Sequence, residues 1–292
     1  MEKFINICQM TQEQLKQYVS EELKKTHKKC ISDDGYVYAQ GNFPVLLVAH
    51  MDTVHKELPT VINYDEKTQS LSSPNGIGGD DRCGIYMVLE VVKKYNCSVL
   101  FTEDEEKGCI GAEKFVSSKL AQDLEFNYII EFDRKGKNDA VFYDCDNADF
   151  TKFITKEFFK TAWGSFSDIS IIAPYLECAA VNLSCGYYQP HTTSECVVFP
   201  EMNKVIEEAY KILERTTESD KFEYIEKKRY SNYYYDDYYN YYLVEYYDEN
   251  CEAQYFYTSA ISKAEAVGKC LMQNPYVTYN DITDVVRYGD YF

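Results

Sequence analysis

The stretch PVLLVAH at residues 44–50 is continuously apolar until it ends in a histidine. An unbroken apolar run of this length is typical of a central parallel strand that is covered on both faces. Two similar runs follow, SVLFT at 98–102 and YIIEF at 128–132, and segments with a helical apolar period lie between the runs, at 80–95 and 109–121. This alternation predicts an α/β fold in three layers, with a mostly parallel sheet flanked by helices.

Further segments extend this pattern on both sides. Residues 11–27 predict a surface helix, and residues 35–41 predict a short strand. Another buried strand is expected near 178–184. Residues 200–215 predict a helix with a proline in its first turn. The α/β pattern therefore ends near residue 215.

The composition changes near residue 220. The stretch 221–242 is rich in tyrosine and charge and has no clear amphipathic period, which predicts a linker or an exposed edge. Beyond it the sequence predicts a hairpin that turns at 248–250, then a helix with a capping box formed by Ser262 and Glu265, and then a final strand within 277–288. We therefore expect a small α+β module with the element order ββαβ at the C-terminal end.

The overall composition limits the class of protein. The 292 residues carry a net charge of −18, which makes a nucleic-acid partner unlikely, because phosphate contacts need clustered cations. A membrane span and a signal peptide are not indicated, so a cytoplasmic protein is expected. The 11 cysteines are irregularly spaced and without a C-x-x-C pair, which predicts reduced, buried thiols. This reading is based on Cys83, Cys97, Cys109 and Cys178, which lie in apolar or small-residue runs.

Acidic residues and histidines follow the predicted strands at the points where the strands end. In an open α/β sheet, ligands bind beyond the carboxyl ends of the strands, so these side chains are expected to meet at one edge. Clustered carboxylates repel one another unless cations neutralise them. The side chains delivered to this edge are His50, Asp52, Asp80, Asp81, Asp104, Glu105, Glu106, Asp133 and His191.

Two imidazoles and three carboxylates from this set suit a pair of divalent metal ions held by nitrogen and oxygen ligands. Zn²⁺ is the expected metal, and Co²⁺ or Mn²⁺ would fit the same ligands. The charges balance, because two ions bring +4 while Asp80, Glu106, Asp133 and a bridging hydroxide bring −4. Asp52 could hydrogen-bond the second imidazole nitrogen of His50. Of Glu105 and Glu106, one could bind metal while the other stays free as a general base.

Simpler explanations exist for single residues. An Asp-Glu-Glu sequence alone is usually a solvated turn. His27 is expected at the surface, and His55 is expected either at the surface or in contact with substrate. Asp81 could cap the helix at 80–95 or supply charge to its first turn instead of binding metal. The metal-site hypothesis therefore depends on the combination of segments and on no single one.

In this combination the sequence resembles the di-zinc exopeptidase superfamily, which includes the tripeptidase, aminoacylase and carboxypeptidase G families and compact di-zinc aminopeptidases. The resemblance covers roughly residues 45–215, and its motifs occur in the family's order. These motifs are HMDTV (50–54), GGDDRCGI (78–85), TEDEEKGCIGA (102–112), EFD (131–133) and PHTTSE (190–195).

The resemblance implies a role for each residue of the motifs. It implies that His50 binds one metal, that Asp80 bridges, and that Glu106 binds the first metal. Asp133 and His191 would complete the pair of sites. By the same resemblance Glu105 is the general base and Asp52 orients His50. Residues 1–220 would then form the di-zinc hydrolase domain, and residues 221–292 the Tyr-rich linker with its ββαβ module.

The sequence also departs from larger members of the superfamily, which insert a dimerisation lid between the last two ligands. Only 57 residues separate Asp133 from His191, so the chain is similar to the compact, lidless branch. An oxyanion-binding histidine from a partner's lid cannot be assumed, and Tyr187 or Tyr188 is the candidate for that task. Two further residues could line the pocket, orient a ligand or merely cap the following helix, and these are Ser167 and Asp168.

These features predict a zinc-dependent exopeptidase, either an aminopeptidase or a dipeptidase. It would hydrolyse short peptides through a hydroxide held by two metal ions, with Glu105 taking the proton. An N-acyl amino-acid deacylase is the alternative within enzymes, and its substrates would be acyl amino acids. A non-catalytic metal-binding scaffold with a partner for the Tyr-rich tail is the alternative outside enzymes. Neither a nucleic acid nor a membrane is expected as a partner, and the oligomeric state stays open.

Overall fold

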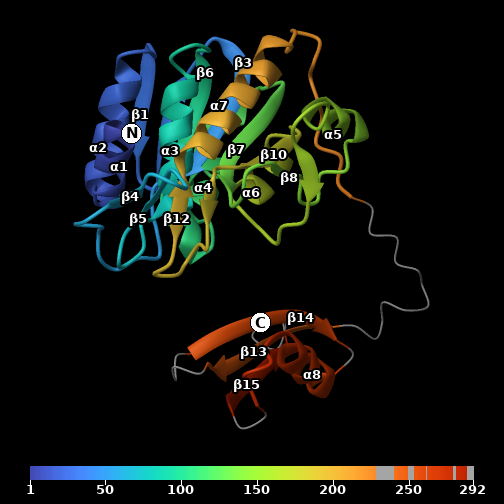
Figure 1. Ribbon diagram of the computed structural model, residues 1–292. Coiled ribbons are helices and arrows are strands. Elements are labelled where there is room, and N and C mark those ends of the chain that lie inside the picture. Colours follow the sequence, from blue (N-terminus) through green and yellow to red (C-terminus); the bar gives the residue numbers. More distant parts are fainter. Residues whose placement is uncertain (228–239, 249–252, 261, 279–280, 288–292) are drawn as a thin grey trace. The chain divides into compact units, whose positions relative to one another are not determined.

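The apolar runs expected to form strands lie side by side in the computed structural model of the chain (Figure 1). The structure describes residues 1–227, 240–248, 253–260, 262–278 and 281–287. The chain divides into two compact units, Met1–Lys227 and Lys228–Phe292, and each is described by itself.

An eight-stranded sheet forms the centre of the first unit (Figure 1). Its four central strands, β6, β3, β7 and β10, run parallel, while β1 and β2 are antiparallel at one side and β8 is antiparallel to β10. The expected α/β fold class with a mostly parallel sheet is therefore confirmed. In spatial order the strands are β1 (Lys29–Asp33), β2 (Tyr36–Gln40), β6 (Cys97–Thr102), β3 (Phe43–His50), β7 (Tyr128–Arg134), β10 (Ala180–Ser184), β8 (Asp139–Val141) and β9 (Lys160–Ala162).

Helices cover both faces of this sheet and make the outer layers. The apolar side chains of α1, α2, α3, α5 and α7 belong to one buried cluster, and those of α4 and α6 belong to another. These helices are α1 (Glu2–Cys8), α2 (Gln12–Lys24), α3 (Gly79–Val91), α4 (Ile110–Val116), α5 (Ala148–Ile154), α6 (Ile169–Tyr175) and α7 (Phe199–Glu214), with short 3-10 turns η1 (Glu105–Lys107) and η2 (Ala121–Asp123).

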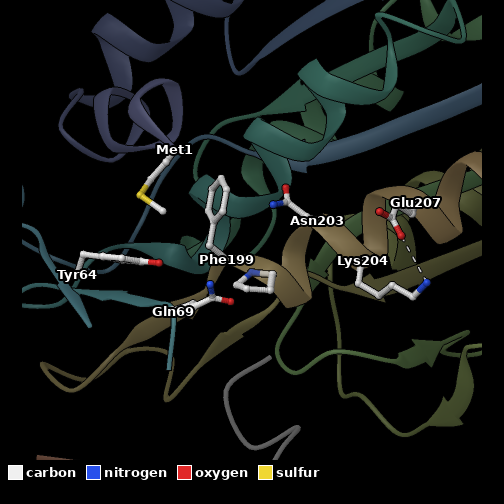
Figure 2. Close-up of a pocket in the computed structure, with 8 residues that line it drawn as sticks. Met1, Tyr64, Gln69, Phe199, Asn203, Lys204 and Glu207 are labelled. Atoms are coloured by element: carbon white, nitrogen blue, oxygen red, sulfur yellow. Dashed lines mark hydrogen bonds and ion pairs between the residues drawn. The ribbon is translucent and has the colours of Figure 1, made fainter. Parts of the chain in front are cut away.

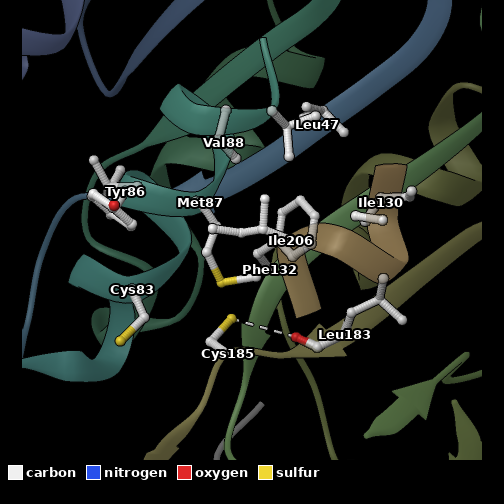
Figure 3. Packing of buried hydrophobic residues seen from close by; sticks show 14 of the residues in the cluster. Leu47, Cys83, Tyr86, Met87, Val88, Ile130, Phe132, Leu183, Cys185 and Ile206 are labelled. Atoms are coloured by element: carbon white, nitrogen blue, oxygen red, sulfur yellow. Dashed lines mark hydrogen bonds between the residues drawn. The ribbon is translucent and has the colours of Figure 1, made fainter. Parts of the chain in front are cut away.

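Strand β3 shows why an unbroken apolar run is needed at the centre of the sheet. Successive side chains of a strand point to opposite faces. Val45, Leu47 and Ala49 accordingly join the cluster on the side of α3 and α7, whereas Leu46 and Val48 join the cluster on the side of α4 and α6. Figure 3 shows the first of these clusters, in which Leu47 packs near side chains of α3 and α7. Each fully buried aliphatic side chain contributes about 1.5–3 kcal/mol.

Local signals in the sequence start the helices where expected. Thr11 accepts a hydrogen bond from the backbone N–H of Gln14 at 3.2 Å, and the Gln14 side chain accepts the Thr11 N–H at 3.0 Å, which is a capping box at the start of α2. Pro200 lies in the first turn of α7. The expected strands at 44–50, 98–102 and 128–132 are confirmed as β3, β6 and β7.

A second, smaller sheet belongs to the same unit and was not expected from the sequence. It is antiparallel, and its strands are too short to show an alternating pattern. In spatial order they are β11 (Tyr187–Tyr188), β12 (Cys196–Val198), β5 (Ser70–Ser72) and β4 (Asn63–Asp65). Its importance is that the turn from β11 to β12 carries His191.

The second unit has the element order ββαβ that its sequence indicates. Strands β13 (Asn240–Tyr247), β14 (Ala253–Ala260) and β15 (Ile282–Arg287) form an antiparallel sheet with β13 in the middle, and α8 (Lys263–Gln273) packs on it. Tyr242, Val244 and Cys270 are among the residues of its separate buried core. The expected turn at 248–250 and the capping box with Glu265 fall at least partly outside the described residues.

The residues that follow α7 still pack on the first unit beyond residue 220, where the composition changes. Phe222 packs on Tyr128 and Phe150, with ring centroids 6.1 and 5.2 Å apart. Glu223 and Glu226 form isolated bridges with Cys178 and Cys145. The start of the Tyr-rich stretch is therefore structural, while residues 228–239 lie outside the described part of the chain.

The cysteines of the described residues lie mostly in the interior. The ten that the structure describes are free thiols, and eight of these are buried. In the same described part of the chain, no helix combines the length and apolar character that a membrane crossing requires.

Candidate metal centre

Parallel strands deliver the candidate ligands to one edge of the main sheet. His50 is the last residue of β3, Asp133 lies near the end of β7, and Glu106 belongs to η1 just after β6. Asp80 lies in the first turn of α3, and His191 lies between β11 and β12. The structure therefore brings together five side chains that are far apart in the sequence.

The first ligand set consists of His50, Asp80 and Asp133. Nε2 of His50 lies 3.1 Å from Oδ1 of Asp80 and 3.4 Å from Oδ1 of Asp133. The His50 side chain is 1% exposed, so this set is almost closed to solvent. One ligand atom from each residue lies within 4.8 Å of the others, a spacing that could hold a metal ion.

The second ligand set consists of Asp80, Glu106 and His191. Nε2 of His191 lies 3.2 Å from Oδ2 of Asp80 and 2.9 Å from Oε1 of Glu106. The two oxygens of Asp80 thus face different imidazoles. The resemblance implied that Glu106 shares a metal with His50. The shortest contact of Glu106 is instead with His191, although Glu106 also lies within the same 4.8 Å limit of His50 and Glu105.

The charges of the cluster fit divalent cations. Burial and the neighbouring Asp80 raise the pKa of Asp133 to about 6, although His50 opposes the shift. Hydrogen bonds with Asp80 and Glu106 raise the pKa of His191 to about 10. The pKa of His50 is also raised, because Asp133, Asp52 and Asp80 together outweigh its burial. The imidazoles thus act as the counterions of crowded carboxylates, and divalent ions with nitrogen and oxygen ligands would take over that role.

Asp52 connects the first strand end to the second. Its Oδ1 lies 3.2 Å from Nδ1 of His50 and accepts the backbone N–H of Glu105 at 3.0 Å, while Oδ2 accepts the N–H of Glu106 at 3.1 Å. The carboxylate therefore fixes the ring of His50 through the nitrogen that faces away from Asp80. This is the contact expected of a residue that orients a metal-binding imidazole.

Glu105 is half-buried beside the cluster. Its side chain is not part of the two ligand sets centred on Asp80. Desolvation raises the pKa of Glu105 to about 8; His50 lowers this pKa, whereas Asp133, Asp168 and Glu106 raise it further. A carboxylate whose pKa is raised toward neutrality can accept and release a proton at working pH.

Asp81 acts as a cap within the protein interior. Its Oδ1 accepts the backbone N–H of Gly84 at 2.8 Å, and its Oδ2 accepts the backbone N–H of His50 at 3.2 Å. The alternative that Asp81 caps its helix is therefore the one that the hydrogen bonds support. The same side chain also holds the end of β3 against the start of α3.

Ser167 and Asp168 are buried next to the candidate ligands. The hydroxyl of Ser167 lies 3.1 Å from Oδ2 of Asp133 and donates to Oε2 of Glu131 at 2.6 Å. Asp168 is fully buried and accepts a hydrogen bond from the hydroxyl of Thr102. In the described structure Asp168 is the N-cap residue of α6 without a side-chain capping bond. Of the two residues, Ser167 contacts the candidate ligand Asp133, whereas the hydrogen bond of Asp168 is with Thr102.

The tyrosine hydroxyls proposed for oxyanion binding have other partners. The Tyr187 hydroxyl donates to the backbone carbonyl of Asp133 at 2.9 Å, and its side chain is buried. The Tyr188 hydroxyl donates to the carboxylate of Glu201 on α7. The expectation that one of them stabilises an oxyanion is therefore not supported, because both donors are already used to hold the fold.

Two histidines were placed wrongly by the sequence analysis. His27 is 5% exposed, and its Nε2 lies 2.8 Å from the carbonyl oxygen of Cys97, so it is a buried structural residue and not a surface one. His55 has an 11% exposed side chain, and its Nε2 lies 2.7 Å from Oε2 of Glu195. Their partners are remote in the sequence, which explains the errors.

Sequence reasoning also missed three polar residues beside the centre. Asn182 donates to Oδ2 of Asp133 at 3.3 Å and accepts the Asp133 backbone N–H at 3.0 Å. Glu131, which is 1% exposed, and Glu195, which is fully buried, complete this group. Glu131 and Glu195 were visible inside the EFD and PHTTSE motifs, but nothing in the local pattern distinguished them from neighbouring acids.

A groove elsewhere on the first unit is not this centre. It lies at the start of α7, has a volume of about 390 Å³ and is lined by Met1, Tyr64, Phe199 and Asn203 among others (Figure 2). Its charged residues Lys204 and Glu207 are 3.4 Å apart and pair with each other. The lining contains none of the candidate ligands.

The fold and the arrangement of the candidate ligands fit a metallopeptidase of the di-zinc exopeptidase superfamily. Residues 36–170 match the sequence model of Peptidase family M28, a range that contains His50, Asp80, Glu106 and Asp133. This match covers 135 of the 292 residues, and it supports a metal-dependent hydrolase and the expected superfamily.

Solved structures with the same fold include several peptidases. The chain is similar to the aminopeptidase PepT from Bacillus cereus ATCC 10987, with a TM-score of 0.60 and 14% identity over 73% of this chain and 96% of that one. A tripeptidase from Staphylococcus aureus superposes with a TM-score of 0.57 and 14% identity, over 72% of this chain and 95% of that one.

An archaeal aminopeptidase from Desulfurococcus kamchatkensis gives a TM-score of 0.54 and 15% identity, over 74% of this chain and 94% of that one. No curated protein sequence matches the chain. At these identities the structural likeness shows the fold alone.

Proposed function

We propose that the chain is an aminopeptidase or dipeptidase that hydrolyses short peptides at a centre of two divalent metal ions. The observation that carries this proposal is the position of Asp80, whose Oδ1 faces His50 and whose Oδ2 faces His191. A carboxylate shared between two imidazoles in this way suits two ions about 3.5–4 Å apart.

The proposed ligand sets share Asp80. His50 and Asp133 would hold one ion with it, and Glu106 and His191 would hold the other. Zinc is the proposed metal because the donors are imidazoles and carboxylates, and cobalt or manganese would fit the same donors. When bound, the two ions would polarise the scissile carbonyl and lower the pKa of the attacking water.

Glu105 is the proposed general base. It lies next to the ligand Glu106 in η1, and its raised pKa, about 8, suits a group that exchanges protons near neutrality. Glu105 would take a proton from the attacking water and deliver it to the nitrogen of the leaving amine. Asp52 would keep Glu105 in place by accepting its backbone N–H.

The likeness of the fold to aminopeptidases and to a tripeptidase supports aminopeptidase or dipeptidase activity ahead of N-acyl amino-acid deacylation. Residues 1–220 are proposed as the catalytic domain, and residues 221–292 as the linker and ββαβ module.

A substrate panel tests the proposal. The metal-loaded full chain is incubated with dipeptides, aminoacyl amides and the matching N-acetyl amino acids, and free amino acids are quantified. We expect hydrolysis of substrates with a free amine and a loss of about 10²–10⁴-fold in kcat for Glu105→Gln with metal content unchanged. Glu113→Gln, which removes an exposed carboxylate from α4, is the matched control and should behave as wild type.

Each possible result has a defined meaning. Hydrolysis of acylated substrates only would identify a deacylase. The absence of bound metal together with the absence of hydrolysis would favour a scaffold, and undiminished turnover in Glu105→Gln would refute the role of that residue.

A further inference from the structure

A fully buried carboxylate connects the loops around the proposed metal centre. Glu195 lies in the turn that carries His191, directly before β12, and its side chain is 0% exposed. Its Oε2 accepts the backbone N–H of Gly78 at 2.7 Å and lies 2.7 Å from Nε2 of His55, and its Oε1 accepts the backbone N–H of Asp80 at 3.0 Å.

These contacts join three separate segments of the chain. His55 lies in the loop that follows His50, and the Gly78 and Asp80 amides begin α3. Glu195 itself lies in the His191 turn. One side chain therefore connects the segment that follows His50, the first turn of α3 that carries Asp80, and the turn that carries His191.

The packing around Glu195 leaves little freedom for these loops. A Cβ added to Gly79 would lie 2.8 Å from Cγ2 of Val197, and one added to Gly76 would lie 2.1 Å from the ring of His55. Gly78 has a φ of +69°, in the left-handed region that favours glycine. The backbone thus approaches closely enough for Glu195 to bind two amides at once.

A carboxylate is well suited to this task. It has only acceptor oxygens, which can accept two backbone N–H groups and an imidazole N–H at the same time. Hydrogen bonds to an ionised acceptor are shorter and stronger than those to a neutral one. A glutamine amide in place of the Glu195 carboxylate would turn its N–H₂ group toward one of these N–H donors and leave that donor without an acceptor. A glutamine at this position would therefore keep the shape and lose part of the bonding.

We infer that Glu195 is a positioning residue for the metal centre, which acts with His55 to hold Asp80 between the two ligand sets. This inference rests on the proposed function, because it assigns Glu195 an effect on ions bound at that site. Glu195 does not contact the ligand side chains of the centre in its described hydrogen bonds. It acts through the backbone of Asp80 and through the turn of His191.

The test measures metal affinity in the full chain without relying on turnover. Metal-stripped wild type, Glu195→Gln and His55→Gln are titrated with Zn²⁺ against a chromophoric chelator, and the Co²⁺ forms are compared by their visible absorption spectra. Residues that orient metal ligands typically change affinity by about 10–100-fold when replaced. We expect a loss of this size and an altered Co²⁺ spectrum for Glu195→Gln, and a smaller loss for His55→Gln.

A matched control separates positioning from general destabilisation. Glu208→Gln also replaces a buried glutamate, on α7, whose partners are Lys204 and Lys211 and not the centre. It should bind Zn²⁺ and Co²⁺ as wild type does. The double variant Glu195→Gln/His55→Gln should lose no more affinity than Glu195→Gln alone, because the two residues act as a unit.

The outcomes separate this inference from the proposed function. Wild-type Zn²⁺ affinity and an unchanged Co²⁺ spectrum in Glu195→Gln would overturn the inference and leave the proposed function intact. Failure of the wild type to bind either ion would overturn both. If Glu195→Gln does not fold, His55→Gln decides the question, since unchanged affinity in that variant would refute the coupling.

Discussion

Asp52 accepts the backbone N–H of Glu105 at 3.0 Å with the same oxygen that lies 3.2 Å from the ring of the histidine at the end of β3. Asp52 thus couples the orientation of a proposed metal ligand to the position of the proposed base. Replacing Asp52 with asparagine would keep the size of the side chain and remove the negative charge that holds the His50 ring and the backbone N–H of Glu105.

Asp52→Asn tests this coupling. The amide can donate to Nδ1 of His50 and favour the wrong tautomer, so we expect a loss of about 10–100-fold in metal affinity and a further fall in kcat. Metal titration and steady-state kinetics measure the two effects separately. Wild-type values for both would contradict the prediction, and Glu113→Gln again serves as the control for a lost carboxylate.

Metal removal should destabilise the first unit. Ions that bind only the folded state at 100 times their dissociation constant add about 2.7 kcal/mol of stability. For a domain of this size that corresponds to a fall in Tm of roughly 5–10 °C when the metal is chelated. Differential scanning calorimetry with and without chelator, followed by addition of excess Zn²⁺, measures this fall and its reversal. An unchanged Tm would argue against metal binding by the folded chain.

Asp133→Asn should separate stability from metal binding. Burial and the neighbouring Asp80 raise the pKa of Asp133 to about 6, which shows that its charge is unfavourable when no ion is bound. The neutral isostere should therefore leave the metal-free protein as stable as wild type or more so, while Zn²⁺ affinity falls. A clear loss of stability in the metal-free variant would contradict this account.

Tyr187→Phe tests the correction made to the oxyanion assignment. The hydroxyl donates to the carbonyl of Asp133, so its loss should cost about 0.5–1.5 kcal/mol of unfolding free energy and change kcat little. Removal of a true oxyanion donor costs about 10²–10³-fold in kcat. Urea unfolding and steady-state kinetics distinguish the two results, and a kcat loss of the larger size would restore the catalytic role.

The pH dependence of stability can be tested at Glu208, away from the centre. Burial alone would raise the pKa of Glu208, but hydrogen bonds from Lys211 and Lys204 outweigh it and lower the pKa below its ordinary value of 4.5. A lowered folded-state pKa means that the stabilisation is present above the unfolded pKa and is lost as the pH falls. Glu208→Gln should thus cost about 0.5 kcal/mol at pH 7 and much less in acid. Urea unfolding of the metal-free protein at both pH values measures this, and an equal cost at both would contradict it.

Much of the fold and of the candidate site could be predicted from local patterns. The run at 44–50 needs no tertiary information to indicate a strand buried on both faces, and the residue that ends it, His50, falls at the sheet edge by geometry alone. The same logic placed Asp80, Glu106 and Asp133 near one another. These predictions succeeded because a parallel sheet fixes where its strand ends meet.

The parts of the fold and of the site that were not predicted depend on contacts between segments that are remote in the sequence. His27 looked exposed beside two lysines, yet its partner is a carbonyl of Cys97 in β6. The role of His55 depends on Glu195, which is 140 positions further along the chain. From the sequence, the hydroxyl of Tyr187 was a candidate for oxyanion binding. In the fold this hydroxyl donates to the backbone carbonyl of Asp133. No spacing rule reveals such pairs, because each is created by the packing of loops whose paths the sequence pattern does not specify.

The shared position of Asp80 has a consequence for how the centre would fill. Occupation of either ligand set would orient this one carboxylate for the other set, so the two binding events are linked and each changes the affinity of the other by the same factor. The repulsion between two neighbouring dications opposes the gain from a carboxylate that is already oriented. The affinities of the first and second ion, taken from one titration of the metal-free chain, would therefore report the balance of these two effects at Asp80.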